Sequence, residues 1–166
     1  MTVLPGKRGA SVRYPGRVYR SDPEQDLAAL KSAGIARLIL LVEDEELAGW
    51  SDAGLVNRAA ALGLEIHRHP MPDGSPPAST AEMDEILGSV IETRAMADVA
   101  VACMGGVGRT GTVAACALVA AGWDAGAAIA RVRELRHPMA VETEAQELFV
   151  QMYWSERRSG SATVSP

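Results

Sequence analysis

The stretch Val99-Ala100-Val101-Ala102-Cys103-Met104-Gly105-Gly106-Val107-Gly108-Arg109-Thr110-Gly111-Thr112 decides the fold of this 166-residue chain. It begins with an apolar run rich in valine, which is typical of a buried strand. A glycine-rich loop follows, and the apolar residues 113–120 then indicate a helix. A strand that turns through glycines into a helix directs its loop amides at one point, near the positive end of the helix dipole. The pattern therefore predicts an anion-binding loop, and its glycines allow a close backbone and positive φ angles.

Two side chains in this loop indicate what happens to the bound anion. Cys103 lies where the loop amides and the helix N-terminus favour a thiolate, which is a strong nucleophile. Arg109 carries a planar guanidinium that can hold two oxygens of a phosphate at once. Thr110 follows the arginine, and its hydroxyl can hydrogen-bond the cysteine sulfur. We expect the loop to hold a phosphoryl group with the nucleophile under its phosphorus.

Two other interpretations of the loop are weaker. A Walker loop needs a lysine directly after its second glycine. If the first glycine is Gly106, the second is Gly111, and Thr112 stands where the lysine must be. The other interpretation is a glycine-rich turn beside a buried cysteine, which does not account for the arginine and threonine at their spacing.

These residues resemble the signature of the protein tyrosine and dual-specificity phosphatases, in which Cys, five residues, Arg and then Ser or Thr follow a strand. The resemblance extends over residues 19–153 and is nearest to the small kinase-associated-phosphatase-like and bacterial members. It implies an α/β fold with a largely parallel central sheet, helices on both faces and the site at the carboxyl edge of the sheet. It also implies a set of phosphate-binding residues, namely Met104, Gly105, Gly106, Val107, Gly108 and Arg109.

A second loop supplies the candidate acid. Residues 70–77 are rich in proline and glycine and follow a strand predicted over residues 64–69. Their one acidic residue, Asp73, looks like the general acid of the family, which lies in a Pro-Asp loop ahead of the cysteine. Such an acid protonates the leaving oxygen of a phosphate ester. The alternative for Asp73 is a turn-forming Asp-Gly pair, but the presence of Cys103 and Arg109 favours the acid.

The resemblance implies two further features. Gln146 matches one of the glutamines that orient the water of the second step, whereas Glu142 stands where another glutamine is usual. The alternative is that Glu142 and Thr143 simply cap the last helix. The family also has a histidine before the cysteine, which braces the loop, and this chain has Ala102 there. We expect the absence of this histidine to affect the rate of the reaction more than its chemistry.

The composition limits the class of protein and its partners. An apolar content of 48% and a mean hydropathy of +0.03 suit a globular protein, and we expect one catalytic domain over residues 1–154 and a disordered polar tail over residues 155–166. The net charge of −5 argues against nucleic-acid binding. No apolar run is long enough to span a membrane. Two cysteines do not make a disulfide framework, which favours a reducing cytoplasm. We expect neither a metal nor another cofactor, because the loop itself supplies positive potential.

Elsewhere the pattern alternates between strands and helices. Strands are predicted over residues 17–20, 36–42 and 64–69, in addition to the strand that ends at Cys103. Asp22 is predicted to cap a helix that begins at Pro23. A further helix is predicted over Ser51–Leu62. Other helices follow a capping box at residues 79–82, Asp124 and residue 143.

Together these observations predict a phosphate monoester hydrolase that acts through a phosphocysteine intermediate on phosphotyrosine, with phosphoserine and phosphothreonine as further candidates. Its partner would be a phosphorylated protein or a small phosphate ester. The main alternative is a weak or inactive phosphate-binding pseudophosphatase, which Ala102 supports. A sulfur- or arsenate-handling enzyme also uses a cysteine in an anion loop, but the Arg-Thr-Gly ending and the Pro-Asp loop fit it less well.

Overall fold

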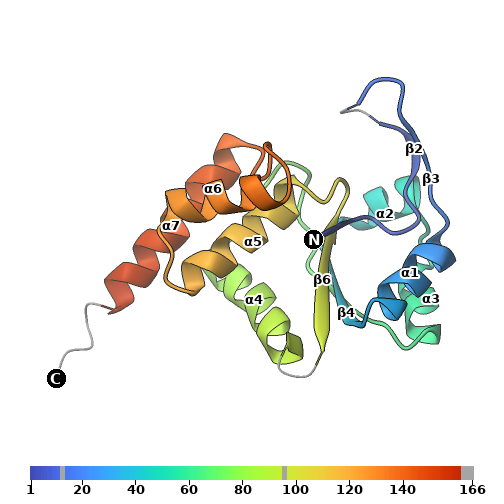
Figure 1. Cartoon of the computed structure of the whole chain (residues 1–166), viewed down its shortest axis with the longest axis horizontal. Coiled ribbons are helices and arrows are strands. Elements are labelled where there is room, and N and C mark those ends of the chain that lie inside the picture. The colour runs from blue at the N-terminus through green and yellow to red at the C-terminus, as the bar shows by residue number, and fades with distance from the viewer. Residues whose placement is uncertain (12–13, 95–96, 162–166) are drawn as a thin grey trace. The chain divides into compact units, whose positions relative to one another are not determined.

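The computed structural model describes residues 1–11, 14–94 and 97–161, which form six strands and seven helices (Figure 1). The strands are β1 Thr2–Val3, β2 Arg8–Ala10, β3 Val18–Arg20, β4 Ile35–Leu40, β5 Glu65–Arg68 and β6 Asp98–Cys103. The helices are α1 Pro23–Ser32, α2 Asp44–Trp50, α3 Leu55–Ala61, α4 Thr80–Arg94, α5 Gly108–Ala120, α6 Ala125–Leu135 and α7 Glu144–Ser161. The chain divides into two compact units, one of Met1–Pro70 with Gly88–Gly106 and one of Met71–Leu87 with the chain from Val107 onward.

The first unit is built on a four-stranded sheet in the order β1-β6-β4-β5, in which all neighbouring strands run parallel. Residues 38–42 are fully buried, as expected of a central strand with an apolar sequence. β6 ends at Cys103, so the cysteine leaves the sheet at the carboxyl end of its strand. The α/β class with a largely parallel sheet is thereby confirmed. The core of this unit is one cluster of Leu4, Leu27, Leu38, Leu40, Val42, Leu47, Leu55, Ala59, Leu64, Ala100 and Ala102.

The N-terminal segment contributes strands that the sequence did not predict. β1 is only two residues long and pairs with β6, with Val3 opposite Cys103. β2 and β3 form a separate antiparallel pair, of which only β3 was predicted. Strands this short carry no periodic signal, because two or three residues are too few to show alternation. The carboxyl end of β1 therefore lies beside that of β6, which brings the following residues to the cysteine loop.

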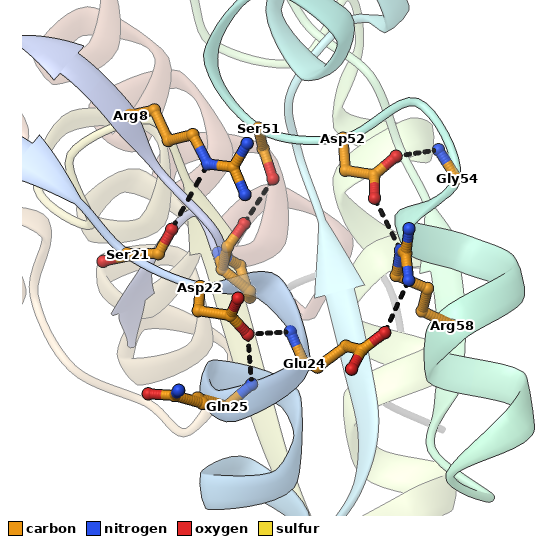
Figure 2. A network of polar contacts seen from close by, with 10 residues as sticks. Arg8, Ser21, Asp22, Glu24, Gln25, Ser51, Asp52, Gly54 and Arg58 are labelled. Carbon is orange, nitrogen blue, oxygen red and sulfur yellow. Dashed lines mark hydrogen bonds and ion pairs between the residues drawn. The ribbon is translucent and has the colours of Figure 1, made fainter.

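Local polar contacts decide where two helices of the first unit begin (Figure 2). Asp22 caps α1 as predicted, since its Oδ1 accepts the N–H groups of Glu24 and Gln25 at 3.0 Å each. The prediction of a helix over Ser51–Leu62 is wrong at its start, because α3 begins only at residue 55. Asp52 explains the difference.

The Asp52 carboxylate forms bonds that a continuous helix would not allow. Its Oδ1 accepts the Gly54 N–H at 2.7 Å, and its Oδ2 lies 2.6 Å from Nε of Arg58 (Figure 2). These two contacts hold the pKa of Asp52 below its usual value, and the Gly54 N–H has the larger effect. A side chain that bonds to a nearby backbone N–H competes with helix formation, and the chain turns here instead.

The second unit is a helical layer in which α5, α6 and α7 pack on one another (Figure 1). Its buried side chains include Val113, Ala115, Cys116, Val119, Ala128, Ile129, Val132, Phe149, Val150 and Tyr153. α7 continues to Ser161, which corrects the expectation of a disordered tail for residues 155–161. Residues 162–166 lie outside the described residues, and the single domain over residues 1–154 stays a prediction.

One glycine sets how closely α5 approaches the segment before α7. A Cβ built on Gly111 would lie 2.7 Å from the backbone nitrogen of Val141 and 3.2 Å from Cβ of Ala140. Real Cβ atoms do not come so near to a backbone atom, and backbone cannot move aside as a flexible side chain can. Val141 itself has a φ of 58°, which is uncommon for a β-branched residue. Only glycine at position 111 fits this contact.

We expect Gly111→Ala to lower the free energy of unfolding by about 1–3 kcal/mol, the usual cost of overpacking. The control is Gly88→Ala on α4, where an added Cβ meets nothing within 4 Å. That control should be neutral or stabilising by about 0.5–1 kcal/mol, because alanine is the better helix former. Urea unfolding of both variants measures the difference. Equal stability of the two would contradict the close approach.

Candidate active site

The first unit carries the cysteine end of the loop. Cys103 is 3% exposed, and the Gly106 N–H donates to its sulfur at 3.2 Å. Gly106 has a φ of 65°, in the left-handed region that glycine adopts without strain. The predicted positive φ is therefore confirmed at Gly106. At Gly105 an added Cβ would meet nothing within 4 Å, so space does not require that glycine. An amide directed at the sulfur can stabilise negative charge there.

The second unit carries the arginine end. Arg109 lies in the first turn of α5, and its side chain is 1% exposed. Its Nη2 lies 2.9 Å from Oδ1 of Asp73, and its Nη1 donates to the Met71 carbonyl at 2.9 Å. Asp73, in contrast, is 77% exposed. A buried cation is thus paired with the one acid of the proline-rich loop, which is the acid that the sequence singled out.

Two residues at the start of α7 hold the same loop. The Thr143 hydroxyl donates to the Gly74 carbonyl at 2.7 Å, and Nε2 of Gln146 donates to the Ser75 carbonyl at 3.3 Å. Gln146 is fully buried. The two side chains therefore connect α7 to the residues that directly follow Asp73.

Thr143 and Gln146 also form a capping box at this helix start. The Gln146 N–H donates to the Thr143 hydroxyl at 3.2 Å, and Oε1 of Gln146 accepts the N–H groups of Glu142 at 2.8 Å and Thr143 at 3.4 Å. Thr143 thus caps α7, which was the alternative that the sequence left open. The pattern Thr-Glu-Ala-Gln was the signal for it.

Glu142 and Gln146 also lie against the loop. A Cβ on Gly108 would come within 2.9 Å of Oε2 of Glu142 and 3.2 Å of Oε1 of Gln146. Glu142 and Gln146 therefore pack closely on Gly108, and no positive φ is involved. The structure brings both predicted water-positioning residues to the N-terminus of α5, although Oε1 of Gln146 is already used in the capping box.

Two other positions of the motif are entirely buried. Thr110 is 0% exposed in the first turn of α5, and Ala102 is 0% exposed in the core cluster of the first unit. The alanine side chain has no hydrogen-bond donor, so it cannot brace the loop as a histidine would.

Lys7 was not among the predicted site residues. Its side chain is almost wholly buried, and its Nζ donates to the carbonyl oxygen of Met104, the residue after the cysteine, at 3.1 Å. The sequence around it, Pro-Gly-Lys-Arg, has no pattern that would place a lysine at the loop, because the contact depends on the pairing of β1 with β6.

Cys116 differs from Cys103 in its surroundings. It lies fully buried in the middle of α5. Burial, with a smaller contribution from the negative charge of Asp84, raises the pKa of its thiol to about 12. Asp84 in turn pairs with Arg157 at 2.9 Å and accepts the hydroxyl of Tyr153. Cys116 therefore stays a neutral core thiol.

Comparison with known proteins identifies relatives of the whole chain. The family model described as "Swiss Army Knife protein, DSP-PTPase phosphatase domain" matches residues 14–150. Cyclin-dependent kinase inhibitor 3 of Rattus norvegicus is 30% identical over 176 residues, which cover 99% of this chain and 79% of that protein.

Two solved structures are also similar. The structure of kinase associated phosphatase with its catalytic site cysteine changed to serine has a TM-score of 0.81 and 26% identity, and the match covers 98% of this chain and 86% of that one. Tk-PTP in its active form has a TM-score of 0.70 and 33% identity, and the match covers 84% of this chain and 91% of that one.

Two further properties of the described residues concern membranes and metals. None of their helices combines the length and apolar character that crossing a membrane requires. Within the same residues, no three or more His, Cys, Asp or Glu side chains are grouped so that they could hold a metal ion. The expectation that the reaction needs no metal stays a prediction.

The two cysteines should differ in alkylation by iodoacetamide. At pH 8 a thiol of pKa about 12 is ionised to about one part in ten thousand. We therefore expect the native protein to take up one label, on Cys103, and Cys116 to react only after unfolding in urea. Mass spectrometry of the tryptic peptides measures both. Fast labelling of Cys116 in the native protein would contradict its assignment as a buried neutral thiol.

Proposed function

Because the chain belongs to the DSP-PTPase phosphatase family, we propose that it hydrolyses phosphate monoesters of proteins through a phosphocysteine intermediate. Phosphotyrosine is the first candidate substrate, and phosphoserine and phosphothreonine are further ones. The roles of the individual residues below are part of this proposal.

One observation carries the proposal: the buried Arg109 guanidinium is paired with the exposed Asp73 carboxylate at 2.9 Å. An arginine that only stabilised the fold would not need an exposed partner on a proline-rich loop. A phosphate that binds to Arg109 competes with Asp73 for its N–H groups, which releases the carboxyl group toward the leaving oxygen. The acid and the phosphate ligand thus act at one place.

In the first step the Cys103 thiolate attacks phosphorus. The bond between phosphorus and the ester oxygen breaks, and Asp73 gives its proton to that oxygen. Arg109 and the amides of residues 104–109 hold the other phosphate oxygens, and their bonds strengthen as negative charge builds in the transition state. The Gly106 N–H directed at the sulfur supports a thiolate at Cys103.

In the second step water attacks the phosphorus of the phosphocysteine. Asp73, now a carboxylate, takes a proton from the water, and the phosphorus–sulfur bond breaks to return the thiolate. Thr110 assists the departing sulfur with its hydroxyl. Gln146 and Glu142 are the candidates to orient the water, and their place against Gly108 supports this.

The loop residues and the relatives of the chain support a class of substrate, and the thiolate supports a compartment. The residues between Cys103 and Arg109 carry no charge, which favours a phosphorylated side chain over a polyanionic lipid or inositol phosphate. The names of the relatives link them to kinases, which supports a phosphoprotein substrate for this chain. A nucleophilic thiolate needs a reducing compartment, and we propose the cytoplasm.

Ala102 supports one alternative, a pseudophosphatase that binds phosphate without turnover. A pure binder needs neither a thiolate nor an acid, and this chain has Cys103 and Asp73 together with Arg109 and Thr110. The enzyme is therefore the better supported of the two.

The first test compares wild type with Cys103→Ser in hydrolysis of p-nitrophenyl phosphate in the presence of a metal chelator. We expect wild-type activity that vanadate inhibits, and no turnover by the variant, because serine is a far weaker nucleophile. The variant should still bind phosphate, since Arg109 and the loop amides remain. Binding of phosphate by a wild type that lacks all activity would establish the pseudophosphatase, and a variant that still turned over would exclude Cys103 as the nucleophile.

The second test is Asp73→Asn, assayed on a tyrosyl phosphate, whose leaving group needs the proton. We expect kcat to fall by about 10²–10⁴-fold, the usual contribution of a general acid. Asp98→Asn, at an exposed carboxylate that begins β6, is the control and should keep the wild-type rate. A loss confined to KM would show that Asp73 only positions Arg109.

A further inference from the structure

Lys7 is a buried cation at the cysteine loop. The residue is only 7% exposed, and its Nζ donates to the Met104 carbonyl at 3.1 Å. The same ammonium lies 4.1 Å from the centroid of the Tyr19 ring, a distance typical of a cation–π contact. Burying an ammonium costs free energy unless it gains partners. Its placement here, beside the residue that follows the nucleophile, therefore calls for a functional reason.

The backbone that carries Lys7 is held on several sides. The hydroxyl of Ser51 donates to the Pro5 carbonyl at 2.6 Å (Figure 2), and the Gly6 N–H donates to Oδ2 of Asp26 at 2.8 Å. The Ser21 N–H donates to the carbonyl of Lys7 itself at 3.0 Å.

Two neighbours complete this support. The side chain of Arg8, the next residue, donates to the Ser21 carbonyl at 3.5 Å (Figure 2). The pairing of Val3 with Cys103 sets this segment beside the loop. These bonds and the β1–β6 pairing hold the backbone of Lys7, so little backbone entropy remains to be lost when the ammonium acts.

An anion-binding loop must turn its N–H groups inward and its carbonyls outward, because a carbonyl oxygen near a phosphate would repel it. Lys7 holds the first of these carbonyls, that of Met104, while the Gly106 N–H is directed at the sulfur of Cys103. A positive charge in a poorly hydrated place also interacts strongly with a nearby anion. Ala102 has no group that could do either task.

We propose that Lys7 is a positioning residue of the phosphate loop: its ammonium fixes the Met104 carbonyl and adds the positive charge that strengthens oxyanion binding at Cys103. For turnover this inference rests on the proposed function, but for anion binding it stands alone. Sequence reasoning assigns no such role to this lysine.

The test measures orthovanadate affinity by calorimetry on the full chain. Lys7→Met keeps an apolar stem of similar length but removes the ammonium, and we expect it to bind vanadate about 10–100-fold more weakly, as loss of a charge-assisted hydrogen bond predicts. Lys7→Arg keeps a charged donor and should recover most of the affinity. Thermal unfolding of each variant shows whether the fold is retained.

The chain offers a matched control in Lys31, its only other lysine. Lys31 also donates to a backbone carbonyl, that of Gly63, at 2.6 Å. It lies exposed in the last turn of α1, just before the amino end of β4, whereas Cys103 lies at the carboxyl end of β6. Lys31→Met should bind vanadate as wild type does. Equal affinities of folded Lys7→Met and Lys31→Met would overturn the proposal.

A second variant guards against a Lys7→Met protein that does not fold. Lys7→Gln retains an amide donor for the carbonyl but carries no charge, and its affinity should still fall several-fold. Affinity equal to that of Lys31→Met would again overturn the proposal. Because binding is measured, a wild type that binds vanadate without hydrolysing phosphate esters refutes the proposed function alone. A wild type that binds no vanadate overturns both.

Discussion

A guanidinium removed from water has to find acceptors inside the protein, and much of the second unit is arranged to provide them for Arg109. The carboxylate of Asp73 and the carbonyl of Met71 both come from one proline-rich loop. That loop cannot move without breaking bonds to a buried charge, which would be costly. The arginine therefore ties an otherwise irregular segment to the start of α5.

The start of α7 supports the same loop from another element. The Thr143 hydroxyl both caps the helix and holds the Gly74 carbonyl. Gln146 uses Oε1 for the cap and Nε2 to hold the Ser75 carbonyl. A helix cap is a local requirement that any helix has. Here it is combined with a long-range one, so that the proline-rich loop is held by residues that also cap the start of α7.

In the first unit the loop after Cys103 needs similar support. The cysteine ends a central parallel strand, and the loop after it needs its carbonyls held away from the anion. β1 is too short to stabilise a sheet much by itself, but its pairing beside β6 delivers Lys7 to the Met104 carbonyl. The family usually places a histidine before the cysteine, and this chain has a core alanine there. Support for the loop thus comes from Lys7, in the segment between β1 and β2.

Particular residues show which parts of the fold and the site the sequence alone could predict. The apolar run before Cys103, the glycines and the apolar run after Arg109 have strong local patterns, and these determined the strand, the turn, the helix and the α/β class. The cap at Asp22 was equally local. Asp73 was identifiable as a candidate acid through the resemblance to the Pro-Asp loop of the family, because an Asp-Gly pair alone would favour a turn. The start of α3 was mispredicted because a single side chain, Asp52, bonded to the backbone in place of helix formation.

Only the tertiary structure decided which residues meet. It paired Asp73 with Arg109, set Gln146 and Glu142 against Gly108, and brought Lys7 to the loop. It also assigned different reasons to the glycines, a left-handed φ at Gly106 and close packing at Gly111. The physical reason is that periodicity and capping act over a few residues. Contacts between residues tens of positions apart depend instead on strand register and helix packing, which the whole chain sets together.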